Sequence, residues 1–219
     1  MTARPLPSLR LGIDEAGRGC VLGPLIVAIV ASNEKDRRWF AQENVRDSKL
    51  VTPAKREYLA AKIRERCWFR LKIATAIDVD IAVRDRSRTL NGLELEMMRD
   101  CVRDSMEQFR DVETSVLVDA PSINAEGFRR KLHATSGWGD IERFHAKHHA
   151  DTDNRTVGAA SILAKSERER LIARLKKELG CDFGSGYSHD ERTITHIKSV
   201  AMDAAHVRWS WATAQRLVE

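Results

Sequence analysis

The stretch of this sequence best suited to chemistry is residues 12–24, which read GIDEAGRGCVLGP. An apolar run that ends at Ile13 delivers two adjacent carboxylates, Asp14 and Glu15, and a glycine-flanked arginine, Arg18, follows at once. Carboxylates at the end of a core strand are costly unless a cation meets them. Glycines beside them let backbone amides come close to a ligand that a Cβ atom would keep away. The pairing indicates a metal site and an anionic, sugar-bearing substrate that share one loop.

Two further carboxylates stand where predicted elements end or begin. Asp119 ends the valine-rich run 115–119, which is typical of a buried strand, and Asp151 precedes a long helical pattern. Phosphodiester hydrolysis with two magnesium ions needs several hard oxygen ligands on a small volume, with the ions about 3.5–4 Å apart. A lone aspartate is more often a helix cap or a surface charge. Asp14 and Asp119 resist that interpretation because each ends an apolar run, whereas Asp153 competes with Asp151.

Five strands and several helices are predicted to position these groups. Alternation in the first strand, residues 9–14, places Asp14 and Glu15 on opposite faces, so the chain must leave the pleat at Glu15 if both serve one site. A second helix, opened by Thr52 and Pro53, should bury Tyr58 on its inner face. The remaining predicted strands are 21–32, 68–77, 115–119 and 141–144, and the other main helices are an Asp78-capped helix, 93–109, 124–135, 154–179, 190–202 and 210–217. Strands mixed with helices predict an α/β fold, and the antiparallel start argues against a purely parallel sheet.

Composition limits the class of protein. A chain of 219 residues can form one well-packed domain, and its net charge of +5 permits a polyanionic partner without proving one. The longest apolar run, residues 20–31, contains Gly23 and Pro24 and is too short to span a bilayer; the first residues do not resemble a signal peptide. The four cysteines have no CxxC spacing, which favours reduced thiols. A cytoplasmic location is expected.

Seven further motifs follow residues 12–24 along the chain. They are Asp47-Ser48-Lys49, Leu90-Asn91-Gly92-Leu93-Glu94, Val118-Asp119-Ala120-Pro121, Ala150-Asp151, the run AASILAK at residues 159–165, Gly184-Ser185-Gly186-Tyr187, and Arg208-Trp209-Ser210-Trp211. In kind and order they resemble the motifs of the type 2 ribonucleases H (ribonuclease HII), which cut RNA in RNA/DNA hybrids and at ribonucleotides embedded in duplex DNA. The later motifs are more similar to the archaeal and eukaryotic branch than to the common bacterial one.

The resemblance implies a fold and a metal centre. The fold would be ribonuclease H-like: a mixed five-stranded sheet flanked by helices, with a helical C-terminal part. Residues 1–219 would form a single catalytic domain, with residues 181–219 as a C-terminal helical appendage. The catalytic, metal-binding set would be Asp14, Glu15, Asp119 and Asp151, holding Mg²⁺ or Mn²⁺, with two ions expected.

The resemblance also implies how the substrate is bound. The backbone of Gly17, Arg18 and Gly19 would contact the ribose 2′-hydroxyl, the group that distinguishes RNA from DNA, although a plain tight hairpin is the simpler interpretation. Lys49 and Lys165 match positions near the scissile and flanking phosphates. Tyr187 matches the tyrosine that packs on the sugar next to the cut. Without the motifs, each lysine would be read as a solvated charge and Tyr187 as partly buried over the C-terminal helices.

A histidine cluster lies beside the fourth carboxylate. His145, His148 and His149 with Asp151 and Asp153 could suggest zinc, but no cysteine lies nearby in sequence, so a solvent-facing or phosphate-side cluster is favoured. The pair His148-His149 departs from the lysine that the family usually has before alanine and aspartate. Gly158 stands where the family often has serine or alanine.

The sequence therefore predicts an endoribonuclease that hydrolyses the RNA strand of RNA/DNA hybrids and cuts 5′ to ribonucleotides in duplex DNA. The products would be a 3′-hydroxyl and a 5′-phosphate, and the protein would act as a monomer away from membranes. Two alternatives stay open. Another nuclease of the same fold, such as a junction resolvase, would cut without a 2′-hydroxyl. A hybrid-binding module without catalysis is disfavoured by the complete carboxylate set.

Overall fold

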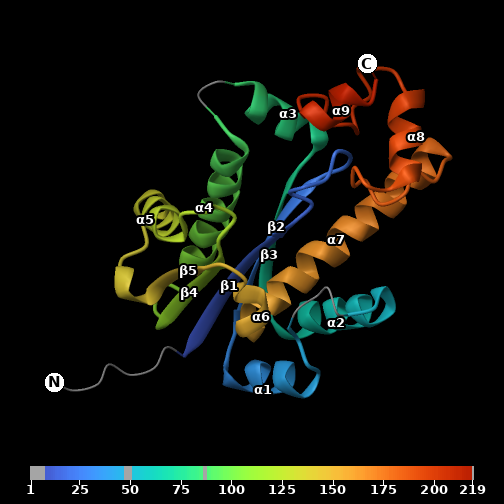
Figure 1. The fold of residues 1–219 in the computed structure, drawn as a ribbon. Helices are drawn as coiled ribbons and strands as arrows, with labels where there is room; N and C mark the ends of the chain where they lie inside the picture. Colours follow the sequence, from blue (N-terminus) through green and yellow to red (C-terminus); the bar gives the residue numbers. More distant parts are fainter. Residues whose placement is uncertain (1–7, 47–50, 86–87, 219) are drawn as a thin grey trace.

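The computed structural model describes residues 8–46, 51–85 and 88–218 and contains a mixed five-stranded sheet in the order β3-β2-β1-β4-β5. The strands are β1 (Leu9–Ala16), β2 (Leu25–Ser32), β3 (Trp68–Ala74), β4 (Thr114–Asp119) and β5 (Phe144–Lys147). β2 pairs antiparallel with both β1 and β3, whereas β1, β4 and β5 run parallel to one another. The predicted mixed sheet is confirmed (Figure 1).

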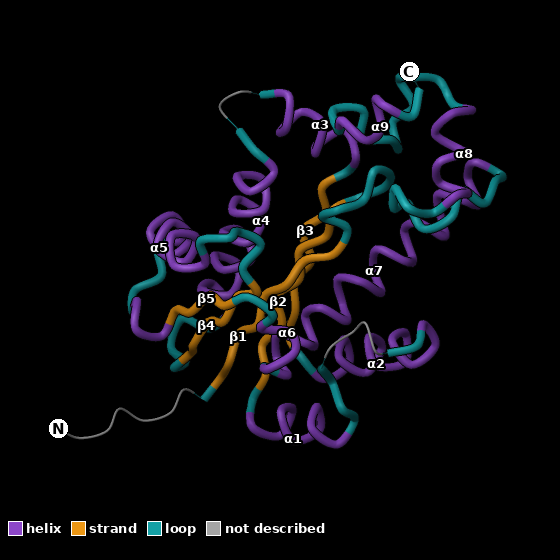
Figure 2. The backbone as a smooth tube through the Cα atoms, in the orientation of Figure 1, coloured by secondary structure: helices purple, strands orange, loops and turns teal. Residues whose placement is uncertain are grey.

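Helices cover both faces of the sheet (Figures 1 and 2). α4 (Leu90–Gln108) and α5 (Ala125–Ser136) pack on one face, and α1 (Glu34–Gln42), α2 (Pro53–Arg66) and α7 (Arg155–Leu179) on the other. The smaller helices are α3 (Ala76–Arg84), α6 (Ala150–Asp153), α8 (Glu191–Ser199), α9 (Ala212–Arg216) and the 3₁₀ turn η2 (Ile141–Arg143). Because β2 is covered on both faces, all of its residues are buried and its sequence is continuously apolar up to Ser32.

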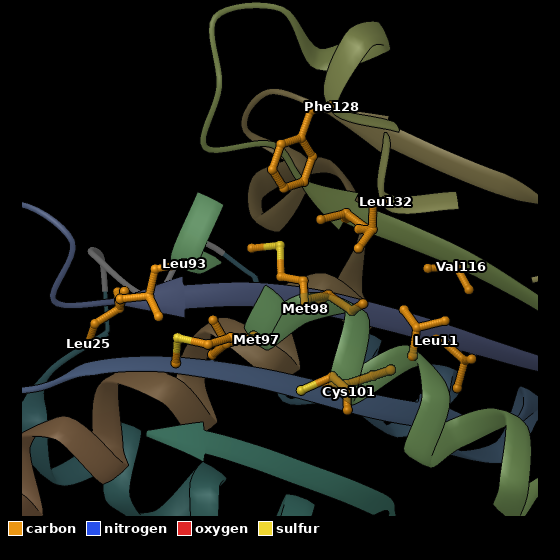
Figure 3. Close-up of a cluster of buried hydrophobic side chains, with 14 of the residues drawn as sticks. Leu11, Leu25, Leu93, Met97, Met98, Cys101, Val116, Phe128 and Leu132 are labelled. Carbon is orange, nitrogen blue, oxygen red and sulfur yellow. The ribbon is translucent and has the colours of Figure 1, made fainter. Parts of the chain in front are cut away.

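The alternation of β1 divides its side chains between the two cores. Leu11 and Ile13 enter the core on the α4 side, whereas Ala16 belongs to the core on the α7 side. Figure 3 shows Met97, Met98 and other α4 side chains packed against the sheet beside Leu11. The period of two expected from the sequence therefore holds along β1.

The long helix α7 lies very close to the backbone of β1. A Cβ atom on Gly12 would lie 2.4 Å from the carbonyl carbon of Thr156, so only glycine permits this approach. Asn154 caps the helix, since its side-chain oxygen accepts hydrogen bonds from the amides of Thr156 and Val157. The first turns of α7 are thereby fixed against the strand that carries Asp14.

The C-terminal elements form a third core with the loop between β1 and β2. Val21 and Leu22 of that loop pack with Phe183, Val207 and other residues after α7. Isolated bridges join Cys20 to Tyr187 and Leu22 to Val207. Segments far apart in the sequence therefore hold one loop in place.

Several predicted boundaries are wrong, each for a local reason. β2 begins at Leu25 rather than at 21, because residues 20–22 pair with the C-terminal segments instead. β3 ends at Ala74 because Thr75 caps α3, with Asp78 as the third helical residue of the capping box rather than the cap. β5 is Phe144–Lys147, and the segment Ile141–Arg143 before it is a 3₁₀ turn.

Two further details concern the surface. Tyr58 was expected on the inner face of α2, but it is 45% exposed and its ring lies under the Lys55 ammonium group. Among the described residues, none of the helices combines the length and the apolar character needed to cross a membrane.

The approach of α7 to β1 predicts that Gly12→Ala destabilises the protein. The added methyl group would meet backbone atoms of Thr156 and Val157, which cannot move aside without displacing the helix. We expect the free energy of unfolding to fall by about 1–3 kcal/mol, as for other overpacked sites, measured by urea denaturation. Gly139→Ala is the matched control, because a Cβ atom there has no neighbour within 4 Å. Equal stability of the two variants would contradict the prediction.

Candidate active site

Three aspartates converge where β1 and β4 end. One carboxylate oxygen from each of Asp14, Asp119 and Asp151 lies within 4.8 Å of the other two. β1 and β4 are parallel neighbours, so their carboxyl ends meet at the same edge of the sheet. The backbone amides of His149 and Ala150 hydrogen-bond to Asp119, which brings α6 and its Asp151 to the same point.

The structure distinguishes two aspartates that residue chemistry alone left in competition and between which the resemblance favoured Asp151. Asp151 is 8% exposed and belongs to the three-aspartate cluster, whereas Asp153 is exposed. They occupy opposite sides of a single helical turn. Within the described ranges, no other group of three or more acidic, histidine or cysteine side chains is spaced closely enough to hold an ion.

Glu15 lies in the same region as Asp14, but the backbone conformation there differs from the one expected. The chain does not leave the pleat at Glu15, because pairing with β2 continues through Glu15 and Ala16. Glu15 nevertheless lines the same cleft as Asp14, and its amide donates a 2.7 Å hydrogen bond to Asp14 Oδ1. Its Oε2 atom is buried without a hydrogen-bond partner among the described residues. Glu15 is therefore a neighbour of the cluster with one buried oxygen available to a ligand.

These carboxylates resist ionisation when no cation is present. Burial, together with the charge of Asp119, raises the pKa of Asp14 to about 7, although a hydrogen bond from Ser161 opposes the rise. Burial and the charges of Asp14 and Asp119 raise the pKa of Glu15 well above its usual value. Burial and Asp151 raise the pKa of Asp119. A divalent cation would relieve this repulsion, and the all-oxygen donor set suits Mg²⁺ or Mn²⁺.

A cleft of about 360 Å³ joins the carboxylates to most of the predicted substrate-binding residues. Its lining includes Gly17, Arg18, Gly19, Lys165 and Tyr187 with all four predicted carboxylates. Lys49 lies outside the described residues. The lining also includes His149 of the histidine cluster, and three residues that the sequence interpretation did not single out, Arg56, Arg168 and Glu169.

The loop that follows β1 is held in a defined shape. Gly17 has φ +89° and a Cβ atom there would lie 2.4 Å from the carbonyl oxygen of Pro24, so glycine is required. Gly19 has open space around its Cβ position. The fully buried Arg208 donates hydrogen bonds to the carbonyl oxygen of Arg18 at 3.1 Å and to that of Gly23 at 2.9 and 3.1 Å. Burial lowers the pKa of Arg208 to about 10.

Tyr187 faces the cleft beside this loop. It is half-buried, its hydroxyl hydrogen-bonds with Cys20, and the Arg168 guanidinium lies 5.3 Å from the ring centroid. Arg168 also donates to the carbonyl oxygens of Leu22 and Ser185. The tyrosine ring is thus fixed at one wall of the cleft rather than packed over the C-terminal helices.

Three residues that support the site were missed by the sequence interpretation. Ser161 bonds to Asp14 and belongs to the AASILAK run, which gave a usable signal. Arg208 belongs to the Arg-Trp-Ser-Trp motif, for which no role was inferred. Arg168 lies in the densely charged half of α7, where nothing distinguishes it from its neighbours in sequence.

The three histidines lie outside the three-aspartate cluster. His145, His148 and His149 are all exposed, and the three-aspartate cluster includes none of them. His149 lines the cleft and its charge lowers the pKa of Asp119, whereas the His148 Nε2 atom lies 3.2 Å from the carbonyl oxygen of Ile123. The favoured interpretation, a solvent-facing or phosphate-side cluster, agrees with this placement.

A larger cavity of about 530 Å³ lies where β4 begins, away from the carboxylate cluster. Its two carboxylates, Glu113 and Asp140, both pair with Arg143. Cavity size alone therefore does not locate the site. The chemistry of the lining places it at the smaller cleft.

Solved structures share this architecture. The ribonuclease H2 of Pyrococcus horikoshii OT3 superposes with a TM-score of 0.82 at 30% identity, covering 96% of this chain and 97% of that chain. The RNase HII of Archaeoglobus fulgidus, solved in complex with PCNA, gives a TM-score of 0.78 at 37% identity, covering 96% and 97%. The fold is that of the ribonucleases H. In this chain it carries an acidic cluster at the strand ends.

The family model for ribonuclease HII matches residues 11–214. The Archaeoglobus fulgidus ribonuclease HII is 37% identical over 212 residues, which are 95% of this chain and 96% of that protein. The chain belongs to the ribonuclease HII family. These enzymes are metal-dependent endoribonucleases that cleave the RNA of RNA/DNA hybrids. The predicted family and its likeness to the archaeal branch are confirmed.

The different placement of Asp151 and Asp153 predicts different responses to metal. Asp151→Asn removes a charged oxygen ligand from the cluster and should greatly reduce the rise in melting temperature that Mn²⁺ causes. Asp153→Asn makes the same chemical change at an exposed position in the same helix and should leave that rise intact. The measurement is thermal unfolding with and without Mn²⁺. If Asp153→Asn removed the Mn²⁺ response and Asp151→Asn kept it, Asp153 rather than Asp151 would be the metal ligand.

Proposed function

We propose that this protein hydrolyses the RNA strand of RNA/DNA hybrids and also cuts 5′ to single ribonucleotides embedded in duplex DNA. One observation carries the proposal: the buried carboxylate cluster and the glycine-arginine-glycine loop line the same cleft. The carboxylate cluster suits divalent cations that bind a phosphate, and the glycine-arginine-glycine loop suits close contact with a sugar. Their combination favours a phosphodiester whose sugar is recognised.

The proposed metal ligands are Asp14, Glu15, Asp119 and Asp151. Two Mg²⁺ or Mn²⁺ ions held by them would act as Lewis acids on the attacking and leaving oxygens of the phosphodiester. The chain itself orients these ligands: Ser161 hydrogen-bonds to Asp14, and the amides of His149 and Ala150 hydrogen-bond to Asp119. The products of this reaction are a 3′-hydroxyl and a 5′-phosphate.

The proposed substrate contacts surround the cluster. Backbone groups of Gly17, Arg18 and Gly19 contact the 2′-hydroxyl, because the glycines leave the backbone accessible. Lys165 lines the cleft near Asp14 and is placed to bind a phosphate, a role that Lys49 would share. Tyr187 packs on the sugar next to the cut. All four proposed metal ligands come from one chain, and the proposed active form is a monomer.

A duplex DNA with one ribonucleotide tests this function directly. In Mg²⁺ or Mn²⁺ the wild-type protein should cut 5′ to the ribonucleotide, and Asp14→Asn should lose nearly all turnover while it still binds hybrid. That substitution removes a charged ligand but little volume. The products are read on a sequencing gel, with an all-DNA duplex as the control. Cutting of the all-DNA duplex would support the alternative nuclease, and normal cleavage by Asp14→Asn would overturn the assigned metal ligand.

Gly19→Ala tests the contact with the sugar. The new methyl group would meet no protein atom within 4 Å, so stability should be unchanged and only a bound substrate would be crowded. We expect kcat/KM on the single-ribonucleotide duplex to fall about tenfold or more, since small misplacements at a reacting centre carry large rate penalties. Gly139→Ala, equally uncrowded and away from the cleft, is the matched control. Unchanged kcat/KM for Gly19→Ala would remove the loop backbone from sugar recognition.

A further inference from the structure

Helix α4 carries a buried carboxylate that the proposed chemistry does not use. Glu94 is 0% exposed, and its nearest buried neighbours along α4, Leu93, Met97 and Met98, are apolar. A carboxylate in such a place is costly unless a cation pairs with it. Its Oε1 atom has no hydrogen-bond partner among the described residues, and its Oε2 atom pairs with Arg18.

α4 holds the Arg18 side chain at two points. Nη1 of Arg18 bonds to Oε2 of Glu94, and Nη2 donates to Oδ1 of Asn91 at 2.7 Å. Asn91 and Glu94 are three residues apart, so they lie on one face of the helix. Arg18 lines the catalytic cleft, whereas neither Asn91 nor Glu94 is among its lining residues. Among the described residues, Arg18 is therefore the side chain that connects Asn91 and Glu94 to the cleft.

Arg18 also has a second carboxylate within electrostatic reach. It attracts Glu15, whose Oε2 atom is buried without a hydrogen-bond partner among the described residues. If the Arg18 guanidinium group were no longer held by α4, it could pair with the buried Glu15 carboxylate. Such a pair would occupy a proposed metal ligand with a fixed positive charge.

We propose that Glu94, assisted by Asn91, is a positioning residue that holds the Arg18 guanidinium on α4 and so keeps Glu15 available to a divalent cation. The proposal rests on the metal site of the proposed function and deepens it, because it makes metal affinity depend on a residue outside the cleft. Glu94 acts through Arg18 and touches neither the cation nor the substrate. Its effect must therefore disappear when the Arg18 side chain is removed.

The experiment measures Mn²⁺ binding to the full chain by isothermal titration calorimetry, without substrate. Glu94→Gln keeps the size of the side chain and loses its charge; it should raise the Mn²⁺ dissociation constant about tenfold, the scale of one charge-assisted contact. Arg18→Ala and the double variant Arg18→Ala/Glu94→Gln should bind Mn²⁺ with equal affinity. This double-mutant cycle separates an effect through Arg18 from general damage to the fold.

Glu96→Gln is the matched control, because Glu96 lies on the same helix and pairs with Arg88 instead. It should leave Mn²⁺ affinity unchanged. Should thermal unfolding show that Glu94→Gln does not fold, Asn91→Ala takes its place, since Asn91 is exposed; it should weaken Mn²⁺ binding in the same direction, again only while Arg18 is present.

Four results would overturn the proposal, and they differ in what they say of the function. Wild-type affinity in Glu94→Gln, or a double variant weaker than Arg18→Ala, rejects the role of Glu94 while the metal site stands. An equal loss in Glu96→Gln assigns the effect to net charge and rejects it as well. Absence of Mn²⁺ binding by the wild-type protein rejects the metal site and this proposal together.

Discussion

The contact between α7 and the backbone of β1 at Gly12 is the constraint on which the rest of the structure depends. It sets α7 directly over the strand that carries Asp14. Ser161, Lys165 and Arg168 then follow at helical spacing along one side of α7, and all three face the region of the cleft. The cap of the same helix, Asn154, also ends α6, which carries Asp151. One close approach thus aligns groups from two elements with the end of the sheet.

The acidic and the basic side chains of the cleft have different roles. Its carboxylates repel one another and await a cation, whereas Arg168 and Arg208 donate mainly to carbonyl oxygens of Leu22, Ser185, Gly23 and Arg18. These buried guanidinium groups shape the loop without neutralising the acids beside it. Arg18, the one arginine of the loop, is held by a carboxylate on α4 instead. These three arginines therefore have partners other than the three aspartates, which stay available to a cation.

Local signals in the sequence predicted what local physics determines. Thr52 and Pro53 begin α2 as expected from capping preferences, and α7 ends at Leu179 as predicted, before Gly180 with φ +63°. The prediction began that helix at Asn154, which is instead its cap. Asp119 was placed correctly at the end of β4 because it directly follows the short apolar run at residues 116–118. The ribonuclease H-like architecture followed from the resemblance, since hydrophobic periodicity alone indicated only a mixed α/β fold.

Local sequence signals could not predict interactions between segments that are distant in the chain. Only the resemblance favoured Asp151 over Asp153, because the physical choice depends on how one turn of helix meets β4 and the sequence contains both residues in similar surroundings. The four-residue strand β5 is too short for its alternation to fix its limits. Glu15 stays in the pleat because β2 continues to pair with it, which no pattern within β1 reveals. In each case the deciding neighbour lies elsewhere in the chain.

The hydrogen bond from Arg208 to the carbonyl oxygen of Arg18 spans 190 positions of the chain, and this has a consequence for synthesis on the ribosome. The sheet strands and their carboxylates leave the ribosome well before Arg208 does, because translation proceeds from the N-terminus. A nascent chain can therefore assemble the acidic cluster while the loop beside it still lacks its buried anchor. The loop therefore reaches its final shape only after Arg208 has left the ribosome.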